Sequence, residues 1–173
     1  MRFRAYIAAS VDGYVATPDG GVEWLEAFDG ESYGYEDFTS DISTIVVGRT
    51  TLDQVLSFGD WPYPGKEVLV LTSRPLEVAP AQTRAWRAGP ESLVAHLRGT
   101  VREGDVWILG GPQTIRAFSE LGAVESYEIF VMPVLLGDGI PLFAPEGARQ
   151  PLRLTGHQVF SNGAVQLAYE PSR

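Results

Sequence analysis

Val106-Trp107-Ile108-Leu109-Gly110-Gly111-Pro112-Gln113-Thr114 is the stretch that decides the fold, because it predicts a buried strand running through two glycines into a helix. Two adjacent residues without a Cβ allow a ligand to approach the backbone, and Pro112 suits the first helical position. We expect the helix to continue to Leu121, with its free N–H groups directed toward an anion. Because glycine and proline are ordinary turn residues, a plain tight turn is the alternative.

Two further expected strand ends carry similar chemistry. Gly48-Arg49-Thr50-Thr51 follows the apolar run 44–48, and Thr72-Ser73-Arg74 follows the apolar run 67–71. The carboxyl ends of parallel strands meet at one edge of a sheet, so a ligand with several phosphates could contact all three stretches. Each arginine taken singly would more simply be a solvated surface charge. The coincidence of three such sites favours a phosphate-bearing ligand.

The order of the apolar runs predicts one α/β domain spanning residues 1–173, built on a mixed sheet. Apolar, β-branched runs alternate with helical patterns in the first two thirds, as is typical of parallel strands covered on both faces. The last two strands form an expected antiparallel hairpin about Ser161-Asn162-Gly163. The expected strands are 2–10, 44–48, 67–71, 83–86, 106–110, 126–132, 152–160 and 164–169, and the expected helices are 32–41, 49–56, 90–98 and 113–121.

Composition restricts the function. The net charge of −9 disfavours binding to nucleic acid or to anionic lipid, since both require a positive field. The chain contains no cysteine and two histidines, His96 and His157, so it is poorly supplied for a metal site and none is expected. No apolar run approaches the roughly 20 residues of a membrane span, and no signal-peptide pattern is present at the start. We therefore expect a soluble, cytoplasmic protein.

Two common nucleotide-binding fingerprints are missing. No G-x-G-x-x-G motif follows the first strand, and the sequence contains no G-x-x-x-x-G-K-[ST] motif. A Rossmann oxidoreductase and a P-loop nucleotide hydrolase are therefore both disfavoured.

Five motifs in order resemble the dihydrofolate reductase superfamily, and more closely the branch containing the C-terminal reductase domain of the bacterial riboflavin biosynthesis protein RibD. The resemblance spans nearly the whole chain. Its most specific part is the P-x-L-L-G-x-G-x-P-L-F pattern of residues 133–143, which dihydrofolate reductases proper lack. The motifs are Ala8-Ala9-Ser10-Val11-Asp12-Gly13, Val47-Gly48-Arg49-Thr50-Thr51-Leu52, Leu71-Thr72-Ser73-Arg74-Pro75, Ile108-Leu109-Gly110-Gly111 and the residues from Pro133 to Phe143.

The resemblance implies a dihydrofolate-reductase-like three-layer α/β/α sandwich on an eight-stranded mixed sheet, with NADPH stretched across the strand ends. It places the pyrophosphate on residues 49–51 and 110–114, the 2'-phosphate on Ser73 and Arg74, and the nicotinamide among small residues of the first strand and its turn. It also implies a cis peptide between Gly110 and Gly111. The implied cofactor residues are Ala8, Ala9, Val15, Ala16, Gly48, Arg49, Thr50, Thr51, Thr72, Ser73, Arg74, Leu109, Gly110, Gly111, Pro112, Gln113 and Thr114.

The substrate side is less well specified. Riboflavin-pathway reductases commonly carry basic residues where this chain has Tyr6 and Tyr14, which weighs against a phosphorylated ribosyl-pyrimidine. Reduction of a C=N or C=O bond needs a proton donor, and among Asp12, Asp29, Glu36 and Asp37 we select Asp37, although a residue on a polar helix face is more often only solvated.

The candidate substrate contacts are Asp12, Trp24 and Trp61. The Asp-Gly pair at 12–13 is equally compatible with simple turn chemistry. The aromatic residues could equally cover the edge of the core.

The resulting hypothesis is an NADPH-dependent reductase that transfers a hydride to a small heterocyclic substrate, such as a pteridine, a pyrimidine or a related C=N or C=O compound. The alternatives are a non-catalytic NADP-binding or regulatory protein and, less favoured, a genuine dihydrofolate reductase. The C-terminal strands resemble those that form dimer contacts in the riboflavin biosynthesis branch, which implies a homodimer.

Overall fold

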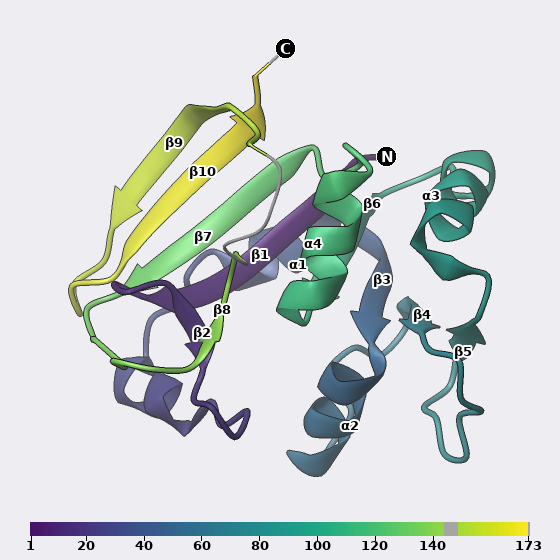
Figure 1. The fold of residues 1–173 in the computed structure, drawn as a ribbon, viewed down its shortest axis with the longest axis horizontal. Coiled ribbons are helices and arrows are strands. Elements are labelled where there is room, and N and C mark those ends of the chain that lie inside the picture. Colours follow the sequence, from purple (N-terminus) through teal and green to yellow (C-terminus); the bar gives the residue numbers. More distant parts are fainter. Residues whose placement is uncertain (144–148, 173) are drawn as a thin grey trace.

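The computed structural model describes residues 1–143 and 149–172. A central eight-stranded sheet has the strand order β5-β4-β3-β6-β1-β7-β10-β9, and β2 pairs with β8 in a separate two-stranded sheet (Figure 1). The strands are β1 Phe3–Ser10, β2 Tyr14–Ala16, β3 Ile42–Gly48, β4 Glu67–Leu71, β5 Thr83–Trp86, β6 Asp105–Gly110, β7 Ser126–Met132, β8 Ile140–Pro141, β9 Leu152–Val159 and β10 Val165–Pro171.

The large sheet is mixed, as expected from the sequence. From β5 through β4, β3, β6 and β1 to β7, each strand is parallel to the next. Strand β10 is antiparallel to β7, and β9 is antiparallel to β10. The predicted C-terminal hairpin is therefore confirmed.

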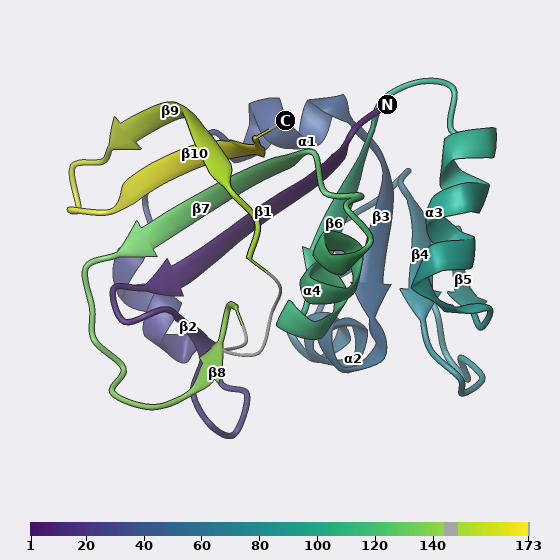
Figure 2. The same cartoon turned by 45° about the horizontal axis from the view of Figure 1, so that its top comes forward.

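Helices cover both faces of the parallel part of the sheet. They are α1 Tyr35–Asp41, α2 Arg49–Ser57, α3 Gly89–Thr100 and α4 Pro112–Glu120, with a 3-10 helix, η1, at Glu23–Phe28. Figures 1 and 2 show α4 in front of the sheet and α1 on its far side. The three-layer α/β/α architecture is thus confirmed.

The alternation of side chains along the buried strands separates two cores. Ile108 packs in the core that contains the buried faces of α3 and α4, whereas its neighbour Trp107 packs in the core that contains Phe38 of α1 and Leu52 of α2. Successive side chains of a strand point to opposite faces, so strands that are apolar at every position can fill both cores.

Three short elements were not among the predicted ones: β2, β8 and η1. Strand β8 contains two residues, and a long-range backbone bond beside it, from Leu142 N to Gly13 O at 2.9 Å, helps to dock this segment against the turn after β1. So short a strand carries no periodic pattern of its own. Within the described ranges, no helix combines the length and apolar character needed to cross a bilayer.

Asp12 joins the turn after β1 to the segment that follows β7. Its carboxylate accepts hydrogen bonds from Leu136 N at 3.1 Å, from Gly137 N at 2.8 Å and from the Ser10 hydroxyl at 2.6 Å. The Ser10 hydroxyl, followed by the Gly137 and Leu136 amides, lowers the pKa of this carboxyl. Asp12 therefore anchors a loop, and it is not among the residues that line the large cavity described below, so its predicted contact with substrate stays a prediction.

We predict that Asp12→Asn lowers the urea unfolding midpoint at pH 7, because the charged form accepts these three bonds most strongly. A lowered folded-state pKa means that the stabilisation is present above the unfolded pKa of about 3.9 and is lost as pH falls through the folded value. The difference from the wild type should therefore shrink below about pH 4.

The matched control is Asp60→Asn, in an exposed loop, where no hydrogen bond to the carboxylate is found within the described residues. A midpoint difference for Asp12→Asn that stayed constant from neutral to acidic pH would contradict the role of the charge.

Candidate functional site

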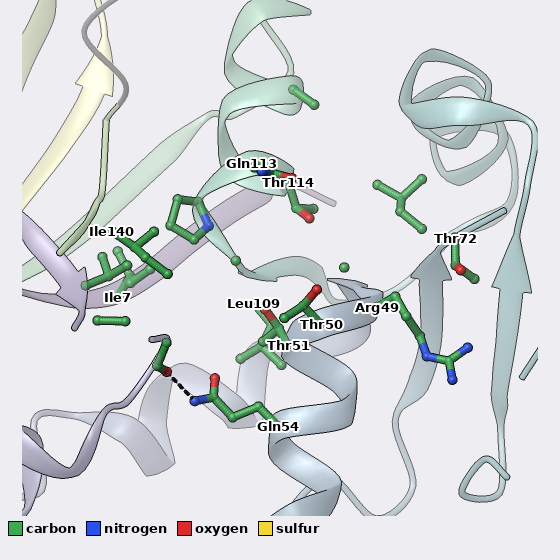
Figure 3. Close-up of a pocket in the computed structure, with 18 of the residues that line it drawn as sticks. Ile7, Arg49, Thr50, Thr51, Gln54, Thr72, Leu109, Gln113, Thr114 and Ile140 are labelled. Carbon is green, nitrogen blue, oxygen red and sulfur yellow. Dashed lines mark hydrogen bonds between the residues drawn. The ribbon is translucent and has the colours of Figure 1, made fainter. Parts of the chain in front are cut away.

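A cavity of about 1100 Å³ lies along the carboxyl edge of the parallel strands (Figure 3). It is lined by the ends of β3, β4 and β6 and by the first residues of α2 and α4. The three stretches that the sequence singled out therefore meet in one place. Figure 3 shows Thr50, Thr51, Gln113 and Thr114 near its middle, with Thr72 toward one end and Ile140 toward the other.

The two helices that begin at the cavity lack capping groups of their own. Gly48 is the N-cap of α2 and Gly111 is the N-cap of α4, and neither helix has a side-chain cap or an acidic residue in its first turn. By contrast, α1 and α3 both carry acidic residues there. Uncapped N–H groups and two positive dipole ends face a common space, which favours an anionic ligand.

Close packing at the strand ends explains the glycines. A Cβ at Gly48 would lie 2.9 Å from Thr114 Oγ1, and a Cβ at Gly111 would lie 3.0 Å from Thr51 Oγ1. Each helix thus contributes a threonine hydroxyl that occupies the space beside the other helix's N-cap. Gly110 has φ +123°, and the Gly110–Gly111 peptide is cis, as the resemblance implied.

Three arginines line the cavity at the end formed by β4, β5 and α2: Arg49, Arg74 and Arg87. Arg49 is already engaged, since its Nε donates to both carboxylate oxygens of Asp53 at 2.8 and 3.0 Å and its Nη1 donates to Pro75 O at 2.9 Å. The guanidinium groups of Arg74 and Arg87 make no ion pair with any described residue. They are therefore the cations available to a ligand at this end.

Trp86 and Arg87 are functional candidates that the sequence analysis missed. Trp86 is the last residue of β5 and Arg87 follows it directly, and this end of β5 lies at the same sheet edge as the ends of β3 and β4. The rule that ligands bind at the carboxyl ends of parallel strands would have found them if it had been applied to the 83–86 strand. The indole Nε1 of Trp86 is buried and has no hydrogen-bond partner among the described residues.

The other end of the cavity is apolar and aromatic. Strand β1 contributes Tyr6, Ile7 and Ala8 to the lining, and β6 contributes Trp107 and Leu109. Further lining residues at this end are Val15, Ala16, Asp19, Gly20, Val22, Leu25, Gln54, Phe58 and Ile140. Gln54 of α2 crosses to the loop after β2, where its Nε2 donates to Gly20 O at 2.8 Å (Figure 3).

Most of the predicted cofactor residues line this cavity; Ala9 and Gly110 do not. Ala9 is 3% exposed and packs in the core under α3 and α4, because it alternates with Ala8 along β1. Gly110 lies between two lining residues, Leu109 and Gly111, and its positive φ turns the backbone between them.

The predicted aromatic substrate contacts also lie outside the cavity lining. Trp24 packs against the cluster that contains Phe130 and Phe160, beneath the C-terminal hairpin. Trp61 packs on the core under α1 and α2, and its Nε1 donates to Tyr63 O at 3.1 Å. Both therefore serve the edge of the core, the alternative that the sequence left open.

The structure does not bring Asp37 to the cavity. In α1, Phe38 points into the core and Asp37 is exposed, since adjacent helical residues face about 100° apart. Its position does not support a role as proton donor. Among the described residues that line the cavity, Asp19 is the one carboxylic acid, and its pKa is lowered by the Thr17 hydroxyl and the Gly21 amide.

Comparisons with known proteins agree with this geometry. The chain is 36% identical over 166 residues to the uncharacterized protein YwjB of Bacillus subtilis, covering 95% of this chain and 94% of that protein. The solved structure of a proposed riboflavin biosynthesis protein from Shewanella sp. PV-4 matches with a TM-score of 0.88 and 29% identity over 100% of both chains.

A dihydrofolate reductase from Enterococcus faecalis, solved in complex with NADP(H), shares the fold with a TM-score of 0.70 and 19% identity, covering 99% of this chain and 97% of that one. The model of the RibD C-terminal domain matches residues 64–166. The chain therefore belongs to the RibD C-terminal domain family, and it shares its fold with a dihydrofolate reductase.

Proposed function

We propose that this protein is an NADPH-dependent reductase that transfers a hydride to a small heterocyclic substrate with a C=N or C=O bond. The observation that carries the proposal is a single cavity with two uncapped helix N-termini and unpaired arginines at one end and an apolar, aromatic wall at the other. The family and the shared fold with an NADP(H)-bound reductase support the same conclusion.

The residues of the cavity fit this cofactor. The orphaned N–H of Trp86 is a donor available to the adenosine part, and Arg74 and Arg87 are cations available to the 2'-phosphate. The uncapped starts of α2 and α4 would bind the pyrophosphate through backbone N–H groups. The small side chains Ala8 and Ala16 leave room beside the backbone for the nicotinamide ring.

Bound NADPH would supply the hydride, and the chain's own residues determine where the proton comes from. Asp19 stays ionised at neutral pH because its pKa is lowered by the Thr17 hydroxyl. The Tyr6 hydroxyl donates to Tyr33 O at 3.0 Å, and burial raises the pKa of Tyr6, so it keeps its proton. In this proposal the substrate therefore takes its proton from water that enters the cavity.

The second candidate function is an NADP-binding protein without turnover. It is favoured by one observation: no neutral carboxylic acid lines the described part of the cavity. A genuine dihydrofolate reductase is a weaker candidate, because the helix acid considered for that role, Asp37, is exposed and lies outside the cavity.

We predict that the protein binds NADPH more tightly than NADH, measured by quenching of tryptophan fluorescence, since Trp86 and Trp107 line the cavity. The double variant Arg74→Gln/Arg87→Gln should lose about tenfold to a hundredfold in NADPH affinity, because hydrogen bonds to charged groups contribute about 1.5 to 3 kcal/mol. Its NADH affinity should change little.

The control Arg84→Gln removes one positive charge from β5, where Arg84 pairs with Glu67 outside this cavity. It should leave both affinities unchanged. Equal affinities of the wild type for NADPH and NADH would contradict the assignment of a 2'-phosphate site.

The reductase and the binding protein differ in NADPH consumption. We predict that the protein oxidises NADPH in the presence of at least one member of a panel of pteridines, pyrimidines and related heterocyclic carbonyl compounds. With such a substrate, the double arginine variant should raise KM for NADPH and leave kcat nearly unchanged, because the 2'-phosphate is held equally before and during hydride transfer. NADPH binding without consumption across the panel would establish the binding protein instead.

We further propose a homodimer formed through the C-terminal strands. Strand β9 is the edge of the large sheet and exposes the apolar side chains Leu152, Leu154 and Val159. An unpaired edge with exposed apolar residues is a favourable surface for a second copy.

Light scattering at micromolar concentration should give twice the monomer mass of 18.9 kDa. The double variant Leu154→Glu/Val159→Glu should shift the protein to monomer, whereas the control Val78→Glu, in an exposed loop elsewhere, should not. A monomer mass for the wild type would overturn this proposal.

A further inference from the structure

We infer that the apolar end of the cavity accepts an uncharged, planar heteroaromatic compound with a lactam-type edge, carrying neither phosphate nor carboxylate. This inference rests on the proposed reductase function and specifies its substrate class. Three features of the described residues support it: the distribution of charge along the cavity, a set of mutually packed rings, and a pair of hydrogen-bonding groups left without partners.

The positive charges of the cavity lie at the cofactor end, where an anionic substrate at the apolar end cannot pair with them. The cationic lining residues Arg49, Arg74 and Arg87 all belong to the cofactor end, whereas the apolar end has Asp19 as its one charged group among the described lining residues. A carboxylate at the rim repels an anionic substrate, and a phosphate or carboxylate entering this end would lose water without gaining a cation. The overall charge of −9 acts in the same direction.

The aromatic wall is held in place by its own ring contacts. Tyr6 packs with its ring centroid 4.5 Å from those of Phe38 and Phe130, and it meets Trp107 edge-on at 6.1 Å. Trp107 is 3% exposed and also meets Tyr63 at 5.5 Å. These contacts restrict rotation of Tyr6 and Trp107, so the cavity offers fixed ring surfaces to which a flat ligand is complementary.

Two polar groups at the apolar end, Trp107 Nε1 and Gln54 Oε1, have no hydrogen-bond partner among the described residues. Trp107 Nε1 is buried and has no hydrogen-bond partner, which is costly unless a ligand supplies an acceptor. Gln54 donates a hydrogen bond from Nε2 to Gly20 O, while its Oε1 accepts no hydrogen bond from the described residues. One donor and one acceptor at this end are thus left for a neutral ring that carries both a C=O and an N–H group, as a lactam does.

The test compares 2-quinolone with 2-quinolone-4-carboxylate, which share a planar lactam ring and differ in one negative charge. Equilibrium dialysis measures their binding to the full chain, both with saturating NADP⁺ and without cofactor. We expect 2-quinolone to bind at least about tenfold more tightly, because the carboxylate has no cation to compensate its lost hydration. Equal or tighter binding of the carboxylate, or no binding of either compound, would overturn the inference.

Two variants test the assignment of groups. Trp107→Phe keeps an aromatic ring and removes the N–H, and should weaken 2-quinolone binding by about threefold to tenfold. Phe58→Arg introduces a cation at a lining position that is 66% exposed, and should narrow or reverse the preference against the carboxylate. The control Leu135→Arg, at an exposed site outside the cavity, should not.

An unchanged preference in Phe58→Arg would contradict the electrostatic argument, and unchanged 2-quinolone binding in Trp107→Phe would contradict the role of the indole N–H. The proposed function is judged separately by NADPH binding and consumption. If NADPH fails to bind, the proposed function fails, while the comparison of the two quinolones in the cofactor-free protein still decides this inference.

Discussion

The close approach of two parallel strand ends is the constraint on which the rest of the structure depends. Strands β3 and β6 are neighbours, with Val47 paired to Gly110, and each turns at a glycine into a helix. A Cβ at Gly48 or Gly111 would come within 3.0 Å of a threonine hydroxyl from the other helix. Two helix N-termini are thereby brought side by side without side-chain caps, an arrangement that favours an anionic ligand.

The cavity that results is electrostatically divided in a protein of net charge −9. Its positive potential comes from a few arginines and from backbone dipoles at the ends of β3, β4, β5 and β6, whereas the part lined by Tyr6 and Trp107 is apolar. In the proposed function, such a division would orient an elongated cofactor, because its phosphates and its neutral ring prefer opposite ends. The same proposal would place the reacting ring beside an aromatic wall in which charged groups are scarce, where shape and a few hydrogen bonds would select the substrate.

Sequence patterns predicted the long elements well, and they also singled out the strand ends that line one end of the cavity, because both depend on local signals. Apolar runs identified the buried strands, and the motifs at residues 48–51, 72–74 and 110–114 stand directly at their carboxyl ends. The apolar end was predicted poorly. Tyr6 and Trp107 are core residues by any local criterion, and only their packing shows that they also line the cavity. For Asp37, the sequence already predicted a polar helix face, and the structure leaves this side chain exposed and outside the cavity lining.

By itself, the sequence determined the fold class, the family and the strand ends that meet at the cavity, since glycines, prolines and β-branched runs act through the backbone near them. Tertiary structure alone decided which arginines are available, because Arg49 is neutralised by Asp53 and Arg87 enters the site from a neighbouring strand. It also decided that Asp12 anchors a loop more than 120 residues away in the chain. Side-chain partners of this kind come from distant segments, and no local pattern records them.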